Sequence, residues 1–522
     1  MSTPSRPADR RDATPVALDE PIAALTDPFA VRVHRPIAAE VADPADPAGP
    51  ALPPYVRREH DERLARVIDR AGGGSSALAV LVGWSATGRT RACWEAVHRL
   101  PAGWRLWRPL DEPDPEAVLA QLPRLGRRTV VWLDGTDRYL DAPGGVGERV
   151  AAALRTLLAS AHQAPVLVLG TLWPSHWGRL TRRGTPHVRA REVLDGAGIV
   201  VPAAFTGAAL DDLRAAAALD GRLRTAMEDA QDGRVAQQLA GVPALLARYR
   251  AAPPAAGALI HAAMDARRLG HRAPLPLGFL AAAAPAYLTR TEQDSLGQDW
   301  LEQALAYTAA PCRGVAGLLG RIRRHDPADL GTGVAYRLAD VIDEPGRQQR
   351  RSQVPPAGFW AAAAAHTFPA DQATLGDAAH ARGMFRDAGQ LHKNAAAHGD
   401  RRGVLYLLSA ATHLRTDVRT IRWAAEHTTL DDPAAVAWLL DGLRGAAAPD
   451  ETVALLRRDP ASHVRLDDPA AVAGLLVRLR GVDADGQVTA LADRAAEQTG
   501  LDDPAAVATL LDGLRGVGAH DQ

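Results

Sequence analysis

The stretch from Ala77 to Val97 constrains the fold of this chain more than any other. It reads ALAVLVGWSATGRTRACWEAV: an apolar run of strand length, a loop of small residues, and an amphipathic helix that begins near Thr90. Gly83, Gly88 and Thr90 fit the phosphate-loop spacing G-x-x-x-x-G-K-[ST], with arginine at the lysine position. Such a loop directs backbone N–H groups and a helix N-terminus at a phosphate. The pattern therefore predicts nucleotide binding.

Arginine at position 89 keeps the positive charge of the motif but changes its shape. A planar guanidinium must fit where the motif places a compact ammonium group. Lys393 is the single lysine among 60 lysine and arginine residues, so a general arginine bias also accounts for Arg89. We expect a nucleotide-binding loop with weak or absent hydrolysis.

Length, charge and cysteine content exclude several other classes of protein. The 522 residues suffice for several domains, and the formal net charge of -1 gives no reason to expect nucleic-acid binding. The longest apolar stretch, Leu275 to Leu288, is shorter than the roughly 18 residues of a membrane span. Two cysteines are too few for a disulfide framework or a zinc site, and no signal peptide is recognisable at the N-terminus. We expect a cytoplasmic protein that does not associate with membranes.

Apolar runs and helical patterns alternate around the phosphate loop. Further strands are predicted at Trp104 to Trp107, Thr129 to Leu133 and Pro165 to Leu169, and helices at Pro115 to Leu122 and Glu148 to Ala161. Continuous apolar strands of this kind are typical of parallel sheets that are buried on both faces. The pattern predicts an α/β P-loop NTPase core, with its ligand at the carboxyl ends of the strands.

Polar residues at two of these strand ends are candidates for chemistry. Asp134 ends the run TVVWL, and we expect it to hold Mg²⁺ together with Thr90. ATPases of this kind usually place a glutamate directly afterwards, but Gly135 stands there, and losing a general base typically costs ~10² to 10⁴ in rate. Asp137 could replace that base or simply cap a turn. Thr171 follows the run PVLVLG and is a candidate contact for the γ-phosphate or the attacking water.

The C-terminal part of the chain contains a repeat. Leu430 to Gly445 reads LDDPAAVAWLLDGLRG, and close copies occupy Leu466 to Gly481 and Leu501 to Gly516. In each copy an aspartate precedes a proline at the first helical position and a glycine closes the helix. The aspartates are Asp432, Asp468 and Asp503. The repeat predicts a solenoid of helical hairpins, and Leu375 to Ala395 resembles a single tetratricopeptide unit.

The order of these motifs resembles the signal-transduction ATPases with numerous domains, the STAND class of P-loop NTPases, and in particular actinobacterial members with C-terminal helical repeats. YVRRE at Tyr55 to Glu59 resembles the element that lines the adenine site. Gly83 to Thr90 and Val130 to Asp134 resemble Walker A and Walker B, and Gly241 to Pro243 resembles the G-x-P element of the helical domain. The resemblance implies that ATP or ADP with Mg²⁺ is bound by Arg58, Glu59, Gly83, Ser85, Thr87, Gly88, Arg89, Thr90, Arg91, Gly241 and Pro243.

The resemblance also implies a division into domains. Residues 1–54 are expected to be a mostly disordered extension, with a docked strand within Asp27 to Pro36. The expected domains are a P-loop NTPase domain at 55–205, a helical domain at 206–270, a winged-helix-like domain at 271–352, a TPR-like region at 355–429 and the LDDP repeats at 430–522, which form a TPR- or HEAT-like solenoid.

The resemblance implies that the chain acts as a switch. It is closed when ADP is bound and open when ATP is bound, and in the open state it is able to oligomerise. A protein partner is expected on the C-terminal repeats. Two alternatives stay open at this stage. The chain is a scaffold of pseudo-NTPase type that binds no nucleotide, or it is a transcriptional regulator that uses the winged helix.

Overall fold

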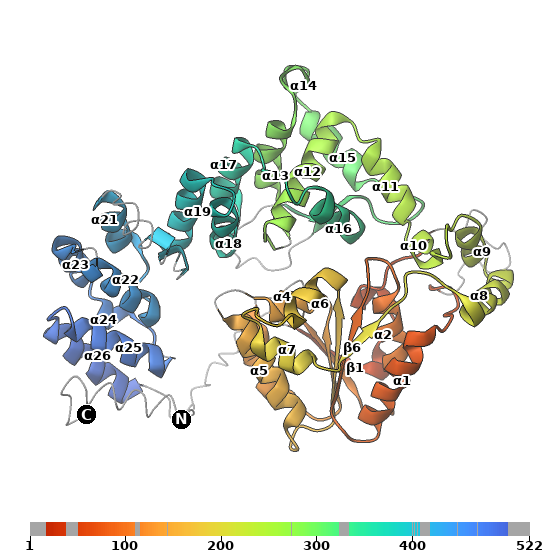
Figure 1. Ribbon diagram of the computed structural model, residues 1–522, viewed down its shortest axis with the longest axis horizontal. Helices are drawn as coiled ribbons and strands as arrows, with labels where there is room; N and C mark the ends of the chain where they lie inside the picture. The colour runs from red at the N-terminus through yellow and green to blue at the C-terminus, as the bar shows by residue number, and fades with distance from the viewer. Residues whose placement is uncertain are drawn as a thin grey trace, which may run out of the picture. The chain divides into compact units, whose positions relative to one another are not determined.

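The computed structural model divides into two compact units (Figure 1). The first comprises Met1–Pro253, Leu305–Thr332 and Leu338–Pro345, and the second comprises Pro254–Ala304, Gly333–Arg337 and Gly346–Gln522. The structure describes residues 17–37, 51–109, 115–142, 145–272, 274–322, 334–398, 400, 402–404, 406–407, 418–445, 447–466 and 468–498.

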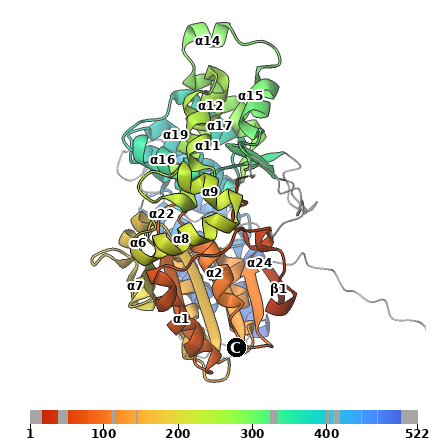
Figure 2. The same ribbon diagram turned by 90° about the vertical axis from the view of Figure 1, so that its right-hand side faces the viewer.

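A six-stranded sheet forms the centre of the first unit. Its strands are β1 (Ala17–Pro21), β2 (Ala77–Val82), β3 (Arg105–Pro109), β4 (Thr129–Leu133), β5 (Val166–Leu172) and β6 (Gly198–Val200). The strand order is β1-β3-β4-β5-β2-β6, with β1 antiparallel at one edge and the other five strands parallel. Figure 2 labels β1 in a view of the same sheet. The strand before the phosphate loop, β2, therefore lies inside the sheet, between β5 and β6. The strands predicted in the apolar run from Ala77 and at Trp104 to Trp107, Thr129 to Leu133 and Pro165 to Leu169 are confirmed.

Helices cover both faces of this sheet, as alternate strand residues show. Leu81 packs with the buried side chains of α1 (Glu59–Gly72) and α2 (Arg89–Val97). Val80 points to the opposite face. That face packs against α3 (Pro115–Gln121), η3 (Leu122–Arg124), α4 (Asp137–Leu140), α5 (Val146–Ala159), α6 (Pro174–Thr181) and α7 (Val188–Leu194). The result is the predicted doubly wound α/β core, with two apolar layers that enclose the strands.

Part of the N-terminal extension belongs to the sheet. β1 pairs with β3 along its whole length, although ALDEP has little strand propensity. The strand expected within Asp27 to Pro36 is wrong. Pro28–Val31 form the 3₁₀-helix η2 because Asp27 caps it by accepting a hydrogen bond from the Phe29 N–H. Val31 and Val33 are buried in the core, so this segment does dock on the domain.

Short helices follow the sheet. They are α8 (Gly207–Leu219), α9 (Gly221–Glu228), α10 (Val235–Leu239) and α11 (Val242–Arg250). The residues expected to form a winged-helix-like domain, 271–352, contribute to both units. They contain β7 (Leu275–Pro276), α13 (Leu277–Ala283), η4 (Ala284–Tyr287), α14 (Arg290–Asp294), α15 (Trp300–Ala309), β8 (Leu319–Ile322), β9 (Ala335–Leu338) and α16 (Asp340–Gln349), with β7 and β9 antiparallel.

A buried ionic cluster lies in the second unit. Asp265 of α12 (Pro254–Arg268) is fully buried. Its carboxylate accepts hydrogen bonds from Arg350 Nε and Nη2 at 2.7 and 2.8 Å, from Arg268 Nε at 2.7 Å and from the Tyr287 hydroxyl at 2.7 Å. Burial opposes ionisation, but these donors outweigh it and lower the pKa of Asp265. The cluster joins three segments of the chain through one carboxylate.

The rest of the second unit is helical. Its helices are α17 (Ala357–His366), α18 (Pro369–His380), α19 (Phe385–Ala397), α21 (Val418–His427), α22 (Pro433–Gly445), α23 (Pro449–Leu456), α24 (Pro460–His463), α25 (Pro469–Arg480) and α26 (Asp485–Gln498). α18 and α19 pack as a pair over the tetratricopeptide-like stretch, with Gly376 against the His392 ring. In the part of the chain that the structure describes, no helix is long and apolar enough to cross a membrane.

The first two copies of the repeat begin as predicted. Asp432 accepts hydrogen bonds from the N–H groups of Ala434 and Ala435, and Asp468 accepts one from Ala471. These are N-caps of α22 and α25, which pack against each other. The third copy, with Asp503, lies outside the described residues. The prediction of a TPR- or HEAT-like class of solenoid stays a prediction.

An arginine that follows each of the first two copies binds carbonyl groups further back in the chain. Arg458 donates to the carbonyls of Ala425 and Thr428 at 2.7 and 2.6 Å. Arg494, at the equivalent position, donates to Ala461 and Val464. Both arginines reach back 33 and 30 residues, and each satisfies carbonyls at or just beyond a helix end. The repeat thus carries its own connection between neighbouring helices.

Replacing Arg458 by methionine is expected to destabilise α21 by about 1 to 3 kcal/mol, because two carbonyls lose a charged donor. Hydrogen exchange of the amides of α21, measured by mass spectrometry, should become faster. Arg457→Met is the control, since the structure shows no such carbonyl contact for that neighbour among the described residues. Equal exchange in the two variants would contradict the role of Arg458.

Candidate nucleotide-binding site

The phosphate loop connects β2 to α2 at the carboxyl end of the sheet. Gly88 adopts φ +93°, a conformation that favours glycine. A Cβ at Gly83 would lie 2.8 Å from Thr87 Oγ1 and 3.2 Å from the Val201 carbonyl, so a side chain does not fit there. The Thr87 hydroxyl closes the loop by donating to the Trp84 carbonyl at 2.9 Å. Both glycines of the motif are therefore required by the geometry.

Arg58 fixes the phosphate loop through a hydrogen bond to its backbone. Its side chain is buried, and it donates to the carbonyls of Thr87 and Pro202, each at 2.8 Å. Its guanidinium also lies over the Phe205 ring. Burial lowers the pKa of Arg58, although Tyr55 and Asp61 favour its charged form. Arg58 is thus a positioning residue for the loop, whereas the neighbouring Glu59 is exposed in the first turn of α1.

Arg89 is the first residue of α2 and is half-buried. Burial lowers its pKa, and the carboxylates of Asp134, Asp340, Glu344 and Asp137 favour its charged form. The guanidinium therefore lies in a strongly acidic environment at the position where the motif places its lysine. Thr90, the second residue of the helix, is also half-buried.

Asp134 and Thr171 lie side by side at the ends of the neighbouring strands β4 and β5. The Thr171 hydroxyl donates to Asp134 Oδ1 at 2.7 Å and accepts from the Gly135 N–H at 2.9 Å. Gly135 has φ +67°, and a Cβ there would come within 2.9 Å of Arg138 Nε. The Thr171 proton is thus engaged by Asp134. The structure thus brings together these two candidate residues.

Arginines surround the Asp134 carboxylate. Burial raises its pKa, but Arg138, Arg32 and Arg108, with the Thr171 hydrogen bond, together lower it. The Asp134 carboxylate and the Thr90 hydroxyl are the hard oxygen ligands that Mg²⁺ prefers, so the donor set fits this ion. The arginine charges oppose a further cation there. Among the described residues, no group of three or more His, Cys, Asp or Glu side chains is arranged to hold a metal ion.

Asp137 is paired with a histidine that sequence reasoning missed. His176 Nδ1 lies 2.6 Å from Asp137 Oδ2, and its ring packs on Trp173. His176 follows β5 in the chain. A polar residue shortly after a strand end was the signal in the sequence that could have indicated it as a site residue. The close contact with His176 favours a structural role for Asp137, which was the alternative to a general base.

Arg91 and Gly241, two further predicted contacts, each have a neighbour within the protein. Arg91 donates to Glu95 at 2.7 Å and to the Pro53 carbonyl at 3.1 Å, so its guanidinium is directed along the helix flank. A contact of Arg91 with the nucleotide stays a prediction. Gly241 caps α11 with φ +67°, and its site for a Cβ faces Val315. Nucleotide contacts by Gly241 and Pro243 stay a prediction.

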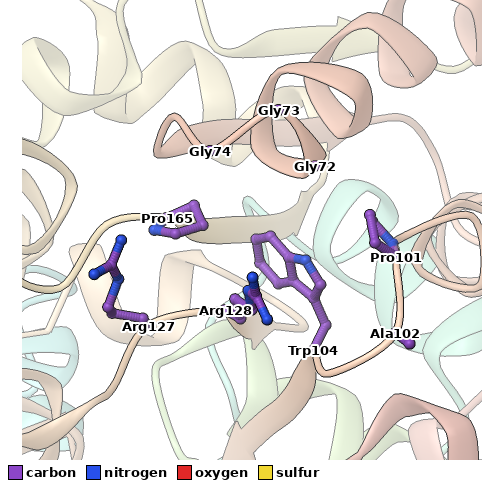
Figure 3. Close-up of a pocket in the computed structure, with 9 residues that line it drawn as sticks. All are labelled: Gly72, Gly73, Gly74, Pro101, Ala102, Trp104, Arg127, Arg128 and Pro165. Carbon is purple, nitrogen blue, oxygen red and sulfur yellow. The ribbon is translucent and has the colours of Figure 1, made fainter.

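A cavity of about 570 Å³ lies at the amino ends of the parallel strands, opposite the phosphate loop (Figure 3). Its lining residues directly precede four parallel strands, so the cavity is at their amino ends, away from the phosphate loop. Trp104 and Arg128 point into the same space in this view. The full lining is Gly72, Gly73, Gly74, Pro101, Ala102, Trp104, Arg127, Arg128 and Pro165. This cavity does not contain the predicted site residues.

The sheet order, the loop and the polar strand ends together define a P-loop NTPase fold. Comparison with known protein families gives no match, and neither does comparison with curated proteins. Two matching solved structures are the Aeropyrum pernix ORC1 protein in complex with DNA and the Aeropyrum pernix ORC2 protein in ADPNP–ADP complexes. The first has 17% identity and a TM-score of 0.30, with 58% of this chain and 94% of that chain covered. The second has 14% identity and a TM-score of 0.32, with coverage of 58% and 96%. At these scores the likeness carries no functional assignment.

Proposed function

We propose that the chain binds ATP or ADP at the phosphate loop and acts as a signalling switch or scaffold of STAND type, with weak or absent hydrolysis. One observation carries the proposal: a properly closed phosphate loop lies beside the Asp134–Thr171 pair, while Gly135 occupies the usual position of the glutamate base. Binding energy would then bias an equilibrium between states rather than drive rapid turnover.

Each residue of the site has a separate role in this proposal. Loop N–H groups and the N-terminus of α2 bind phosphate oxygens, and Arg89 supplies the positive charge. Arg58 fixes the loop through the Thr87 carbonyl. Thr90 and Asp134 would hold the Mg²⁺ that accompanies the nucleotide, which shields phosphate charge when bound. Because arginines already surround Asp134, we expect magnesium to change nucleotide affinity by less than about tenfold.

Calorimetric titration with ADP and ATP, each with and without Mg²⁺, tests the proposal. Wild-type protein is expected to bind, and Arg89→Ala is expected to weaken binding by about 10- to 100-fold, the value of one lost charge-assisted contact. Arg127→Ala is the matched control, because this exposed arginine lines the cavity at the amino ends of the strands, away from the phosphate loop. No binding by the wild-type protein would favour the scaffold without nucleotide.

The C-terminal repeats are proposed as the surface for a protein partner. Trp438 on α22 is 42% exposed, and the copies place glycine and threonine at the same position, in Gly474 and Thr509. Variation at an exposed position over an unchanged apolar stripe suits a surface that contacts different groups along the array. Light scattering with and without ATP tests the accompanying proposal of nucleotide-dependent oligomers. The expectations of a cytoplasmic protein and of no nucleic-acid binding stay predictions.

A further inference from the structure

A carboxylate from a distant part of the chain contacts the phosphate loop. Glu344 Oε2 accepts a hydrogen bond from the Ser85 backbone N–H at 3.0 Å. The two residues are 259 positions apart, and both belong to the first unit. Ser85 lies inside the phosphate-loop motif, where backbone N–H groups serve to bind phosphate oxygens. The carboxylate thus uses a donor that belongs to the predicted anion site.

The surroundings of Glu344 show that the contact is built into the fold. Val341 and Ile342, in the first turn of α16, are buried, so a packed helix presents the carboxylate to the loop. Burial raises the pKa of Glu344 above its ordinary value, whereas the Ser85 hydrogen bond and the positive charge of Arg89 favour its charged form. Loop N–H and arginine are the two kinds of group expected around a bound phosphate.

We propose that Glu344 is an internal anion that occupies the phosphate loop in the absence of nucleotide and must leave it when phosphates bind. The inference rests on the proposed nucleotide binding and adds its regulation. A carboxylate and a phosphate oxygen accept the same hydrogen bond, and two anions beside one arginine repel each other. The measured affinity for nucleotide is therefore lowered by the fraction of molecules in which Glu344 occupies the loop.

Glu344→Gln tests the proposal, because glutamine keeps the size of the side chain and removes its charge. The probes are ADP, ATP and inorganic tripolyphosphate, titrated calorimetrically into the full chain. The variant is expected to bind all three about tenfold more tightly than wild type. Glu192→Gln is the matched control, since this exposed glutamate of α7 pairs with Arg155 and its replacement makes the same change in net charge. The control should bind like the wild type.

A second measurement examines the contact without any ligand. Hydrogen exchange of the peptide that contains Ser85 should be faster in Glu344→Gln, because a neutral amide oxygen is a weaker acceptor than a carboxylate. Unchanged exchange would overturn the proposed contact, whatever the titrations give. Thermal melting of both variants verifies that the fold is retained.

The outcomes separate the two proposals. Wild type that binds nucleotide while Glu344→Gln binds no more tightly would overturn the internal anion and leave the proposed function standing. Tighter binding by Glu344→Gln, including binding that only this variant shows, supports both. Absence of binding by wild type and variant to all three probes would overturn both.

Discussion

Replacing Asp265 by alanine is expected to destabilise the second unit by about 3 to 5 kcal/mol, the largest effect that we predict for a single side chain. The carboxylate is fully buried and accepts four hydrogen bonds, so its removal leaves Arg350 and Arg268 buried without their counter-charge. Differential scanning calorimetry should show a lower transition temperature. Hydrogen exchange should locate the loss of protection in α12.

An exposed ion pair provides the control for this variant. Asp211 pairs with Arg214 at 2.6 Å, and both side chains are mostly exposed to solvent. Asp211→Ala is expected to change stability by less than about 1 kcal/mol, because solvent screens an exposed pair. Similar effects of the two replacements would show that the buried cluster is not a major source of stability.

The same cluster predicts how stability depends on pH. The pKa of Asp265 is lower in the folded protein than in the unfolded chain, so the unfolded state binds the proton more readily. This contribution is fully present above about pH 4, the ordinary pKa of aspartate, and is lost as the pH falls through the folded value. The stability difference between wild type and Asp265→Ala should therefore shrink in acid. A difference that stays constant down to pH 2 would contradict the assignment.

Replacing Arg58 by methionine is expected to weaken nucleotide binding by at least about tenfold, because Arg58 holds the backbone of the phosphate loop in place. The Thr87 carbonyl and the Pro202 carbonyl lose their buried donor, a cost of about 1 to 3 kcal/mol for each unsatisfied group. The loop is then no longer fixed in the conformation that binds phosphate. Calorimetric titration measures the affinity, and thermal melting measures the stability.

The neighbouring arginine gives a matched control. Arg57 has the same chemistry but is exposed. Arg57→Met should leave affinity and melting temperature close to those of the wild type. If Arg58→Met lowers stability but binds nucleotide normally, then Arg58 supports the fold and has no role in positioning the loop.

The sequence was sufficient to predict the elements whose signals are local. The apolar run of β4, the glycines of the phosphate loop and the caps Asp432 and Asp468 each depend on residues close by in the chain. The pairing of Asp134 with Thr171 could also be anticipated, because the carboxyl ends of neighbouring parallel strands meet at one edge of a sheet.

Other features depend on contacts that no local pattern records. β1 forms because the edge of β3 offers hydrogen-bonding groups, despite the poor strand propensity of ALDEP. Glu344 lies in a helix that contains Pro345, and nothing near it in the sequence points to Ser85.

The arginine contacts of the C-terminal repeats affect how easily further repeats can be added to the chain. Arg458 and Arg494 lie at the same distance after their copies, and each binds carbonyls 33 and 30 residues before it. A duplicated unit that consists of a copy and the residues after it would bring both the arginine that it needs and the carbonyls that the next unit requires. Gain of such a unit would therefore need no compensating substitution at the junction.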